Sequence, residues 1–363
     1  MSSGMIRVLV IDDSAFSRRT ITRMLESSPI VRVVGAARNG EEALRKAFEL
    51  KPDLITVDLE MPRMDGFTFL RVLMAKSPIP VLVISGRSGE GDVFKALDLG
   101  AIDFIVKPTS KATPELQNIR AELIRKVHAI RELRIERVKE RIVKAPPMVI
   151  ETCEPASAPA LDSTVVVIAS STGGPAAIMQ TLGAFSEPPA CSILIAQHMP
   201  AGFTTDFAER LNRSTSFSVQ EAKGGEIPTP GTVLLAPGGL NLELESIRGR
   251  IQTRIVPSDP MEKYVPSADR LFATAAEHYG AQLMGVVLTG MGDDGCLGAL
   301  AVQKAGGFVV AESEETAVIF GMPQQAIRAG AVDEVVPLHE VPASIQARVS
   351  SDAVLPETGR GSA

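Results

Sequence analysis

The strongest constraint on the fold is an alternation of short apolar runs with helix-compatible segments, which occurs twice in the 363 residues. The first block contains the runs IRVLVI, VRVVGAA, LITV, PVLVIS and DFIV, and the second contains TVVVIAS, CSILIAQ, TVLLAPG, GVVLTG and FVVAES. Strands that alternate with helices form parallel sheets covered by helices on both faces. The sequence therefore predicts an α/β protein with two domains: an N-terminal (βα)5 domain and a C-terminal doubly wound, mostly parallel α/β domain.

The segment between the two blocks predicts where the domains meet. From Leu116 to Val138, apolar residues recur mostly at intervals of three or four, which predicts one long amphipathic helix. A stretch rich in Pro, Ala and Ser follows and is typical of a linker. We therefore predict a first domain, a helix end with linker, a second domain and a disordered tail at residues 1–125, 126–163, 164–345 and 346–363.

Charge and composition exclude several classes of protein. Residues 145–363 carry 12 Lys and Arg against 24 Asp and Glu, a net charge of −12, whereas nucleic-acid binding needs cations. No apolar run approaches the ~18–20 residues of a membrane span, and the N-terminal segment lacks the pattern of a signal peptide. The three cysteines are odd in number and unclustered, which favours neither a disulfide framework nor a zinc site. We predict a cytoplasmic protein that neither inserts into the membrane nor binds nucleic acid.

Acidic residues follow two of the predicted strands in the first domain. Asp12 and Asp13 come directly after IRVLVI, and Asp58 comes after LITV. The carboxyl ends of neighbouring parallel strands face one crevice, and three carboxylates there suit Mg²⁺. Ser85 and Lys107 end two further runs and would add a hydroxyl and an ammonium group. Singly, such acids are usually loop residues or helix caps; together with a metal and a lysine, they suit an aspartate that accepts a phosphoryl group.

This set of residues resembles the receiver domain of bacterial two-component response regulators, in the stretches VLVIDDS, ITVDLEMPRMDG, VLVISG and DFIVKP. The resemblance implies that Asp58 accepts a phosphoryl group from a histidine kinase. It implies a Mg²⁺ site formed by Asp12 (through water), Asp13, Asp58 and the backbone carbonyl of Glu60. It also implies that the phosphoryl group is contacted by Ser85 and Lys107, and that the aromatic switch residue is Phe104.

In the second domain, a nucleophile, a base and an acid follow three different strands. Ser170 and Ser171 end one run, His198 follows the next, and Asp293 and Asp294 follow a third. The crevice rule brings them to one edge of the sheet, and together they are the components of a Ser-His-Asp hydrolase. Of the four histidines, only His198 stands at a predicted strand end. The glycine-rich loops match neither a nucleotide-binding motif nor the lipase-type G-x-S-x-G turn.

Residues 164–340 resemble the catalytic domain of the CheB family of chemotaxis protein-glutamate methylesterases. The matching stretches are SSTGGP, AQHMPAGFT, FAERLN, PSADRLF, LTGMGDDG and FGMPQQAI. The resemblance implies that Ser171 is the nucleophile, His198 the base and Asp294 the orienting acid. It also implies that Thr172 lines the site and that the Met291 N–H contributes to the oxyanion hole.

Two positions depart from the family pattern. Ala169-Ser170 replaces the commoner Gly-Ala before the nucleophile, and Val265 stands where an arginine commonly precedes Pro-Ser. The resemblance implies a phosphorylation-regulated methylesterase and glutamine deamidase that acts on methyl-accepting chemotaxis receptors, with no cofactor for the esterase reaction. Two alternatives stay open at this point: a hydrolase of the same fold that acts on another ester or amide, and a phospho-dependent binding protein whose triad is inert.

Overall fold

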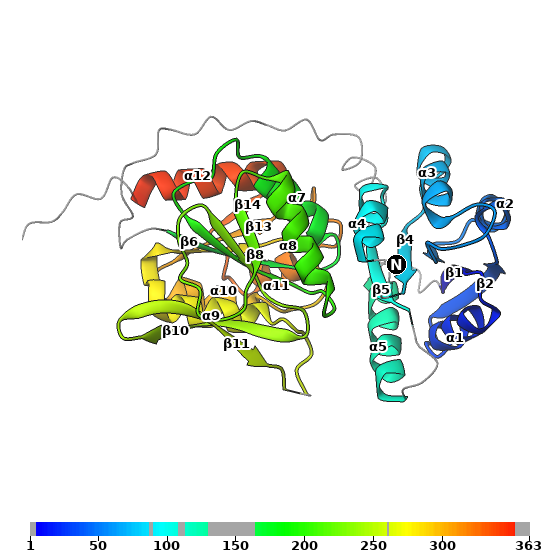
Figure 1. Cartoon of the computed structure of the whole chain (residues 1–363), viewed down its shortest axis with the longest axis horizontal. Helices are drawn as coiled ribbons and strands as arrows, with labels where there is room; N and C mark the ends of the chain where they lie inside the picture. The colour runs from blue at the N-terminus through cyan, green and yellow to red at the C-terminus, as the bar shows by residue number, and fades with distance from the viewer. Residues whose placement is uncertain (1–4, 87–89, 108–112, 130–163, 260, 353–363) are drawn as a thin grey trace, which may run out of the picture. The chain divides into compact units, whose positions relative to one another are not determined.

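The computed structural model describes residues 5–86, 90–107, 113–129, 164–259 and 261–352. The chain divides near residue 145 into two compact units, and each unit has its own parallel sheet (Figure 1). The predicted α/β class is therefore confirmed. The boundaries at residues 125 and 163 remain predictions: residue 125 lies inside the helix Thr113–Ala129, and the segment 130–163 lies outside the described residues.

The first unit contains a five-stranded parallel sheet in the order β2-β1-β3-β4-β5. Its strands are β1 (Ile6–Ile11), β2 (Val31–Ala37), β3 (Leu54–Val57), β4 (Val81–Ser85) and β5 (Asp103–Val106). Its helices are α1 (Ala15–Leu25), α2 (Gly40–Leu50), α3 (Gly66–Lys76), α4 (Glu90–Asp98) and α5 (Thr113–Ala129). The first three helices begin where a side chain accepts a hydrogen bond from a backbone N–H three residues ahead, at Ser14, Asn39 and Asp65.

The second unit contains a seven-stranded parallel sheet in the order β14-β13-β12-β6-β7-β9-β8. Its strands are β6 (Val165–Ser170), β7 (Ser192–Gln197), β8 (Ser218–Glu221), β9 (Thr232–Leu235), β12 (Leu283–Val287), β13 (Phe308–Glu312) and β14 (Glu334–Val336). Its α-helices are α7 (Gly174–Gly183), α8 (Phe203–Ser214), α9 (Ala268–Tyr279), α10 (Cys296–Lys304), α11 (Met322–Arg328) and α12 (Val341–Asp352). A separate antiparallel hairpin is formed by β10 (Leu240–Ile247) and β11 (Arg250–Pro257).

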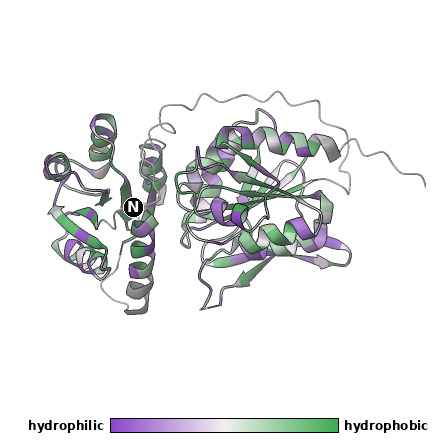
Figure 2. Cartoon of the chain, turned by 180° about the vertical axis from the view of Figure 1, so that it is seen from behind, coloured by the Kyte–Doolittle hydropathy of each residue, from purple (hydrophilic) through white to green (hydrophobic). Residues whose placement is uncertain are grey.

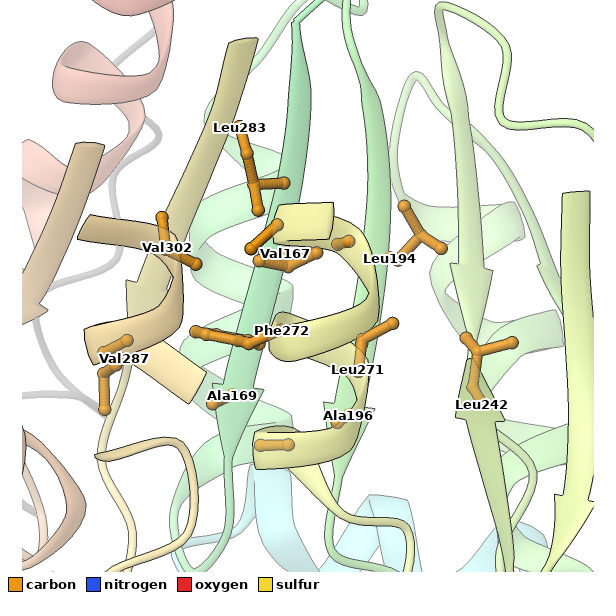
Figure 3. Packing of buried hydrophobic residues seen from close by; sticks show 14 of the residues in the cluster. Val167, Ala169, Leu194, Ala196, Leu242, Leu271, Phe272, Leu283, Val287 and Val302 are labelled. Atoms are coloured by element: carbon orange, nitrogen blue, oxygen red, sulfur yellow. The ribbon is translucent and has the colours of Figure 1, made fainter. Parts of the chain in front are cut away.

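The core of the second unit lies between its sheet and the helices that cover it. Every residue of β6, β7 and β12 is buried, as expected for parallel strands covered on both faces. Figure 3 shows Phe272 of α9 lying over β6, near Val167 and Ala169, while Leu271 of the same helix lies toward β7. The strands of both sheets are predominantly hydrophobic, whereas the helices also carry hydrophilic residues (Figure 2). Within the described residues, every helix is too short or too polar to cross a bilayer.

Phe272→Ala should strongly destabilise the second unit. The ring is fully buried, and it packs so closely that a Cβ at Gly298 would lie 2.5 Å from the Phe272 Cβ. Removing it should lower the free energy of unfolding by about 3–5 kcal/mol, from lost burial and the cavity left behind. Urea unfolding followed by tyrosine fluorescence reports this unit, since the chain has no Trp and both tyrosines lie in it. Ile227→Ala, at a side chain exposed by 48%, is the control and should stay within about 0.5 kcal/mol.

One predicted boundary is wrong. The tail was expected to begin at residue 346, but α12 continues to Asp352. Val341 and Ile345 are fully buried on this helix, and the guanidinium group of Arg348 donates to the carbonyl of Ala281. The helix therefore has tertiary contacts beyond residue 346, which the polar composition of the segment concealed. The predicted long helix that includes Leu116 is observed as far as Ala129, and its remainder lies outside the described residues.

Candidate functional sites

The candidate active site lies where the strand order of the second sheet reverses. β6 is flanked by β7 on one side and by β12 on the other, so the loops that follow these three strands meet. The His198 N–H donates to the Ser170 carbonyl at 3.1 Å, and the Ser171 N–H donates to the Thr289 carbonyl at 3.1 Å. Backbone hydrogen bonds thus join the serine loop to both the histidine loop and the aspartate loop.

The two adjacent serines have different environments. Ser170 is fully buried, and its hydroxyl donates to Gln197 Oε1 at 2.7 Å. Gln197 Nε2 in turn donates to the carbonyls of Ser171 and His198, each at 3.0 Å. Ser171 is only half-buried, and within the described part of the chain its hydroxyl forms no hydrogen bond. Ser170 is therefore a structural group, and Ser171 carries the available hydroxyl.

Asp294 lies at the N-terminus of α9, where unpaired backbone N–H groups favour an anion. Its carboxylate accepts hydrogen bonds from the N–H groups of Ala268 at 2.7 Å and Asp269 at 2.9 Å, and from Ser267 Oγ at 3.2 Å. Burial alone raises the pKa of Asp294, but the hydrogen bond and charge of His198 and these N–H groups lower it below its ordinary value. Asp294 is thus held as a buried carboxylate.

The imidazole of His198 is oriented by this carboxylate. Nε2 lies 2.7 Å from Asp294 Oδ2. The carboxylate is an acceptor, so the neutral ring must carry its proton on Nε2, which leaves a lone pair on Nδ1. Nδ1 has no hydrogen-bond partner among the described residues, and no direct hydrogen bond joins it to the Ser171 hydroxyl. His198 and Asp294 are therefore paired, while Ser171 stands on the adjoining loop with a free hydroxyl.

The loop that follows β12 passes close to Ser171. A Cβ at Gly290 would lie 2.9 Å from the Ser171 Cβ and 2.2 Å from Met322 Sδ, so only glycine fits there. The next residue, Met291, has a backbone N–H without an acceptor in the described part of the chain. Thr172 is buried, and its carbonyl accepts from Thr289 Oγ1 at 3.0 Å, which ties the serine loop to the same segment.

Sequence reasoning missed two residues of this site. Gln197 bonds to the backbone of both loops, and its place directly before His198 in the AQHMP stretch was a usable signal. Tyr264 stacks on the His198 ring, with ring centroids 5.0 Å apart and planes inclined by 4°. Its only signal was its position next to Val265, where the sequence departs from the family pattern.

The predicted acidic site of the first unit forms at the carboxyl ends of β1 and β3. Asp12, Asp13 and Asp58 each offer an oxygen within 4.8 Å of the others, and Asp13 is the exposed member. Lys107 Nζ lies 2.6 Å from Asp58 Oδ2 and 3.0 Å from Asp12 Oδ2. Asp13, Asp58, Glu60 and Lys107 line one cleft.

The donor set fits a hard divalent cation. Asp12 Oδ2 is buried and, although close to Lys107, receives no aligned hydrogen bond from the residues that the structure describes. Burial raises the pKa of Asp12 above its ordinary value, and the charge of Asp58 adds to this, against the opposing effect of Lys107. One ammonium group does not balance three clustered carboxylates, so a Mg²⁺ ion with oxygen ligands would relieve the excess charge.

Two further predicted residues lie on the neighbouring strands. Ser85 ends β4, and its side chain lies outside what the structure describes. Phe104 is buried on β5, its carbonyl accepts from Lys126 Nζ at 2.7 Å, and Lys126 also pairs with Asp103 at 2.9 Å. Phe104 is thus held in the core next to a buried ion pair.

Each half of the chain matches a known protein family. Residues 166–345 match the CheB methylesterase family, and residues 8–117 match the response regulator receiver domain. The protein-glutamate methylesterase/protein-glutamine glutaminase 1 of Myxococcus xanthus is 48% identical over 340 residues, covering 94% of this chain and 96% of that protein. The corresponding enzyme 3 of Geobacter sulfurreducens is 48% identical over 354 residues, covering 92% and 94%.

The second unit is similar to a solved structure. The crystal structure of the Thermotoga maritima CheB methylesterase catalytic domain is 38% identical, covers 52% of this chain and 99% of that chain, and superposes with a TM-score of 0.50. Relatives of this identity and coverage establish the family, including its two-domain organisation. The chain belongs to the CheB family of protein-glutamate methylesterases/protein-glutamine glutaminases, enzymes with an N-terminal response regulator receiver domain.

Proposed function

We propose that this protein removes methyl groups from glutamate side chains of methyl-accepting chemotaxis receptors in the cytoplasm, with Ser171, His198 and Asp294 as its catalytic residues. The observation that carries the proposal is the Nε2–Asp294 hydrogen bond, which leaves Nδ1 available as a base, while Ser171 on the adjoining loop has a hydroxyl without a partner among the described residues. An inert triad would not require a buried carboxylate held by α9. The names of the relatives supply the substrate class.

In the first half of the reaction, Ser171 Oγ attacks the carbonyl carbon of the methyl ester, and its proton passes to His198 Nδ1. The negative charge that develops on the ester oxygen accepts a hydrogen bond from the Met291 N–H. The C–O bond then breaks, methanol takes the proton from Nδ1, and a glutamyl ester of Ser171 remains. Asp294 stabilises the imidazolium throughout and stays ionised.

In the second half, water attacks the glutamyl ester while His198 Nδ1 accepts its proton. The proton then returns to Ser171 Oγ, and glutamate is released. A glutamine side chain would follow the same path with ammonia as the leaving group, because amide and ester pass through similar tetrahedral intermediates. The esterase steps are assigned to side chains and backbone groups of this chain alone.

The receiver domain is proposed to regulate this reaction through phosphorylation of Asp58 by a histidine kinase. Asp13, Asp58 and the Glu60 carbonyl would hold Mg²⁺, with Asp12 assisting through water. The ion would neutralise the oxygens of the incoming phosphoryl group. Lys107, already in contact with Asp58, and Ser85 would bind that group once it is transferred.

The decisive experiment measures methanol release from methylated receptor in membranes, with and without a small-molecule phosphodonor. Release that depends on the protein and is raised by the phosphodonor supports the proposal. An enzyme that cleaves small esters but leaves methylated receptor intact would favour a hydrolase with another substrate. A protein inactive on both would favour the binding role.

Asp58→Asn should abolish stimulation by the phosphodonor and leave basal methanol release in place. The substituted amide cannot accept a phosphoryl group, whereas the esterase residues belong to the other unit. In the wild type we expect stimulation of roughly 10–150-fold, the range of a typical coupling of ~1.4–3 kcal/mol. Acid-labile ³²P incorporation is the second measurement, and a label that persists on Asp58→Asn would place the phosphoacceptor elsewhere.

A further inference from the structure

In the proposed active site, the ring of Tyr264 lies beside the imidazole of His198. Tyr264 lies parallel to the imidazole of His198, with ring centroids 5.0 Å apart and an interplanar angle of 4°. One face of the proposed base is therefore covered by the Tyr264 ring. His198 is bounded by this face and by the hydrogen bond from Nε2 to Asp294, and the two contacts constrain different motions of the ring.

The tyrosine is itself fixed through its hydroxyl. The hydroxyl donates to Asp293 Oδ1 at 2.9 Å, and Lys263 Nζ donates to the same oxygen at 2.8 Å. The hydrogen bond of Lys263 lowers the pKa of Asp293, and burial together with the Asp293 charge raises that of Tyr264. The pair is thus a neutral phenol on an ionised carboxylate. Gly292 makes room for it, since a Cβ there would lie 2.0 Å from the Tyr264 hydroxyl.

The segment that carries Tyr264 is anchored at both of its ends by one buried side chain. Asn241 is fully buried; its Nδ2 donates to Glu262 Oε2 at 2.7 Å, and its Oδ1 accepts from the Ser267 N–H at 2.8 Å. Glu262 is also paired with Arg270 of α9 at 2.5 Å. The loop therefore starts and ends on groups tied to α9, the same helix that binds Asp294.

We propose that Tyr264 is a positioning residue for the imidazole of His198, and that Asp293 acts on the site as the anchor of the Tyr264 hydroxyl. The inference rests on the proposed function, in which His198 is the base. The stacked ring holds the imidazole plane so that Nε2 faces Asp294 while Nδ1 is presented to the nucleophile. It also lies over the imidazolium that forms in the transition state, where an aromatic face is favourable to a cation. Asp294 thus orients the imidazole through Nε2, whereas Asp293 anchors the ring that stacks on it.

Tyr264→Leu should lower kcat for methanol release about 10–100-fold with little change in KM. Leucine fills space beside Gly292 but lacks the stacked ring, and small misplacements of a catalytic group cost up to about 10²-fold. Tyr264→Phe keeps the ring and should retain most of the activity, with a loss of only a few-fold in kcat. Asp293→Asn also keeps the ring, and its kcat should fall by only a few-fold as well. Met261→Ala, in the same loop at a side chain exposed by 90%, is the matched control and should match the wild type.

A second readout separates positioning from a merely structural role. With ¹⁵N-labelled histidine, the side-chain shifts of His198 report which nitrogen carries the proton, and the chain has only three other histidines. The wild type and Tyr264→Phe should show the Nε2–H tautomer, and Tyr264→Leu a mixture. Far-UV circular dichroism checks that each variant is folded. If Tyr264→Leu does not fold, Tyr264→Ala provides a second variant without the ring.

Three results would overturn the inference. Equal losses in Tyr264→Phe and Tyr264→Leu would assign the effect to the hydroxyl. A raised KM with unchanged kcat would make Tyr264 a substrate contact. An unchanged tautomer with activity within twofold would leave the ring without a role. The tautomer measurement requires no turnover, so it still tests the inference if the wild type proves inactive on receptor, a result that would count against the proposed function alone.

Discussion

Ser171→Ala is expected to abolish methanol release, with kcat reduced by about 10⁶-fold, the loss typical of a deleted serine nucleophile in a triad. Ser171 is half-buried and its hydroxyl has no competing hydrogen bond within the described residues, so its removal deletes the proposed attacking atom and leaves the surrounding network intact. Methanol release from methylated receptor measures the effect. Burst experiments with a small ester measure whether a covalent acyl-enzyme still forms.

Ser170→Ala is the matched control, because it removes the hydroxyl of the adjacent serine instead of that of Ser171. Its Oγ donates to Gln197 Oε1 inside the protein, so the variant loses a buried hydrogen bond, at about 1–3 kcal/mol of stability. Gln197 keeps its two hydrogen bonds to the Ser171 and His198 carbonyls, so most of the activity should remain. If Ser170→Ala were the inactive variant and Ser171→Ala the active one, the nucleophile would be Ser170.

The sheets could be predicted from the sequence because their strands are buried on both faces. Continuous apolar runs such as LITV and SILIAQ leave little choice of structure when helical segments separate them, and both form strands with nearly the expected ends. The hairpin of β10 and β11 was missed. β10 (LNLELESI) alternates apolar and polar residues along most of its length, whereas β11 (RIQTRIVP) does not, and neither strand belongs to the β/α repeat on which the prediction relied.

The candidate sites were predictable where they depend on strand ends, and not where they depend on loops. Asp58 and His198 stand directly after strands, so the topology places them. Tyr264 reaches His198 from a loop whose course is set by Asn241, a residue that lies more than 20 positions earlier in the chain. Side-chain contacts of this kind come from tertiary packing, and no local pattern encodes them.

Asp294→Asn should lower kcat by about 10⁴-fold, as the equivalent substitution does in serine proteases. Each Asp294 oxygen accepts a hydrogen bond from an N–H of α9, so the amide group of asparagine meets a donor in either orientation. When the amide nitrogen faces His198, it donates to Nε2, the imidazole proton moves to Nδ1, and the base is lost. In both orientations the negative charge that stabilises the imidazolium is gone. Steady-state methanol release and the His198 ¹⁵N shifts measure the two effects.

Asp293→Asn is the control for losing one negative charge next to the site. The Asp293 carboxylate is exposed by 62% and binds Lys263 and Tyr264 instead of His198. A loss of about 10⁴-fold there, with a small loss in Asp294→Asn, would exchange the roles of the two acids.

The pH dependence of stability gives an independent check. The folded-state pKa of Asp294 lies below its ordinary value, so its carboxylate stabilises the fold above the unfolded-state pKa of about 3.9, and this stability is lost as the pH falls through the folded pKa. The difference in free energy of unfolding between the wild type and Asp294→Asn should therefore be larger at pH 7 than at pH 3.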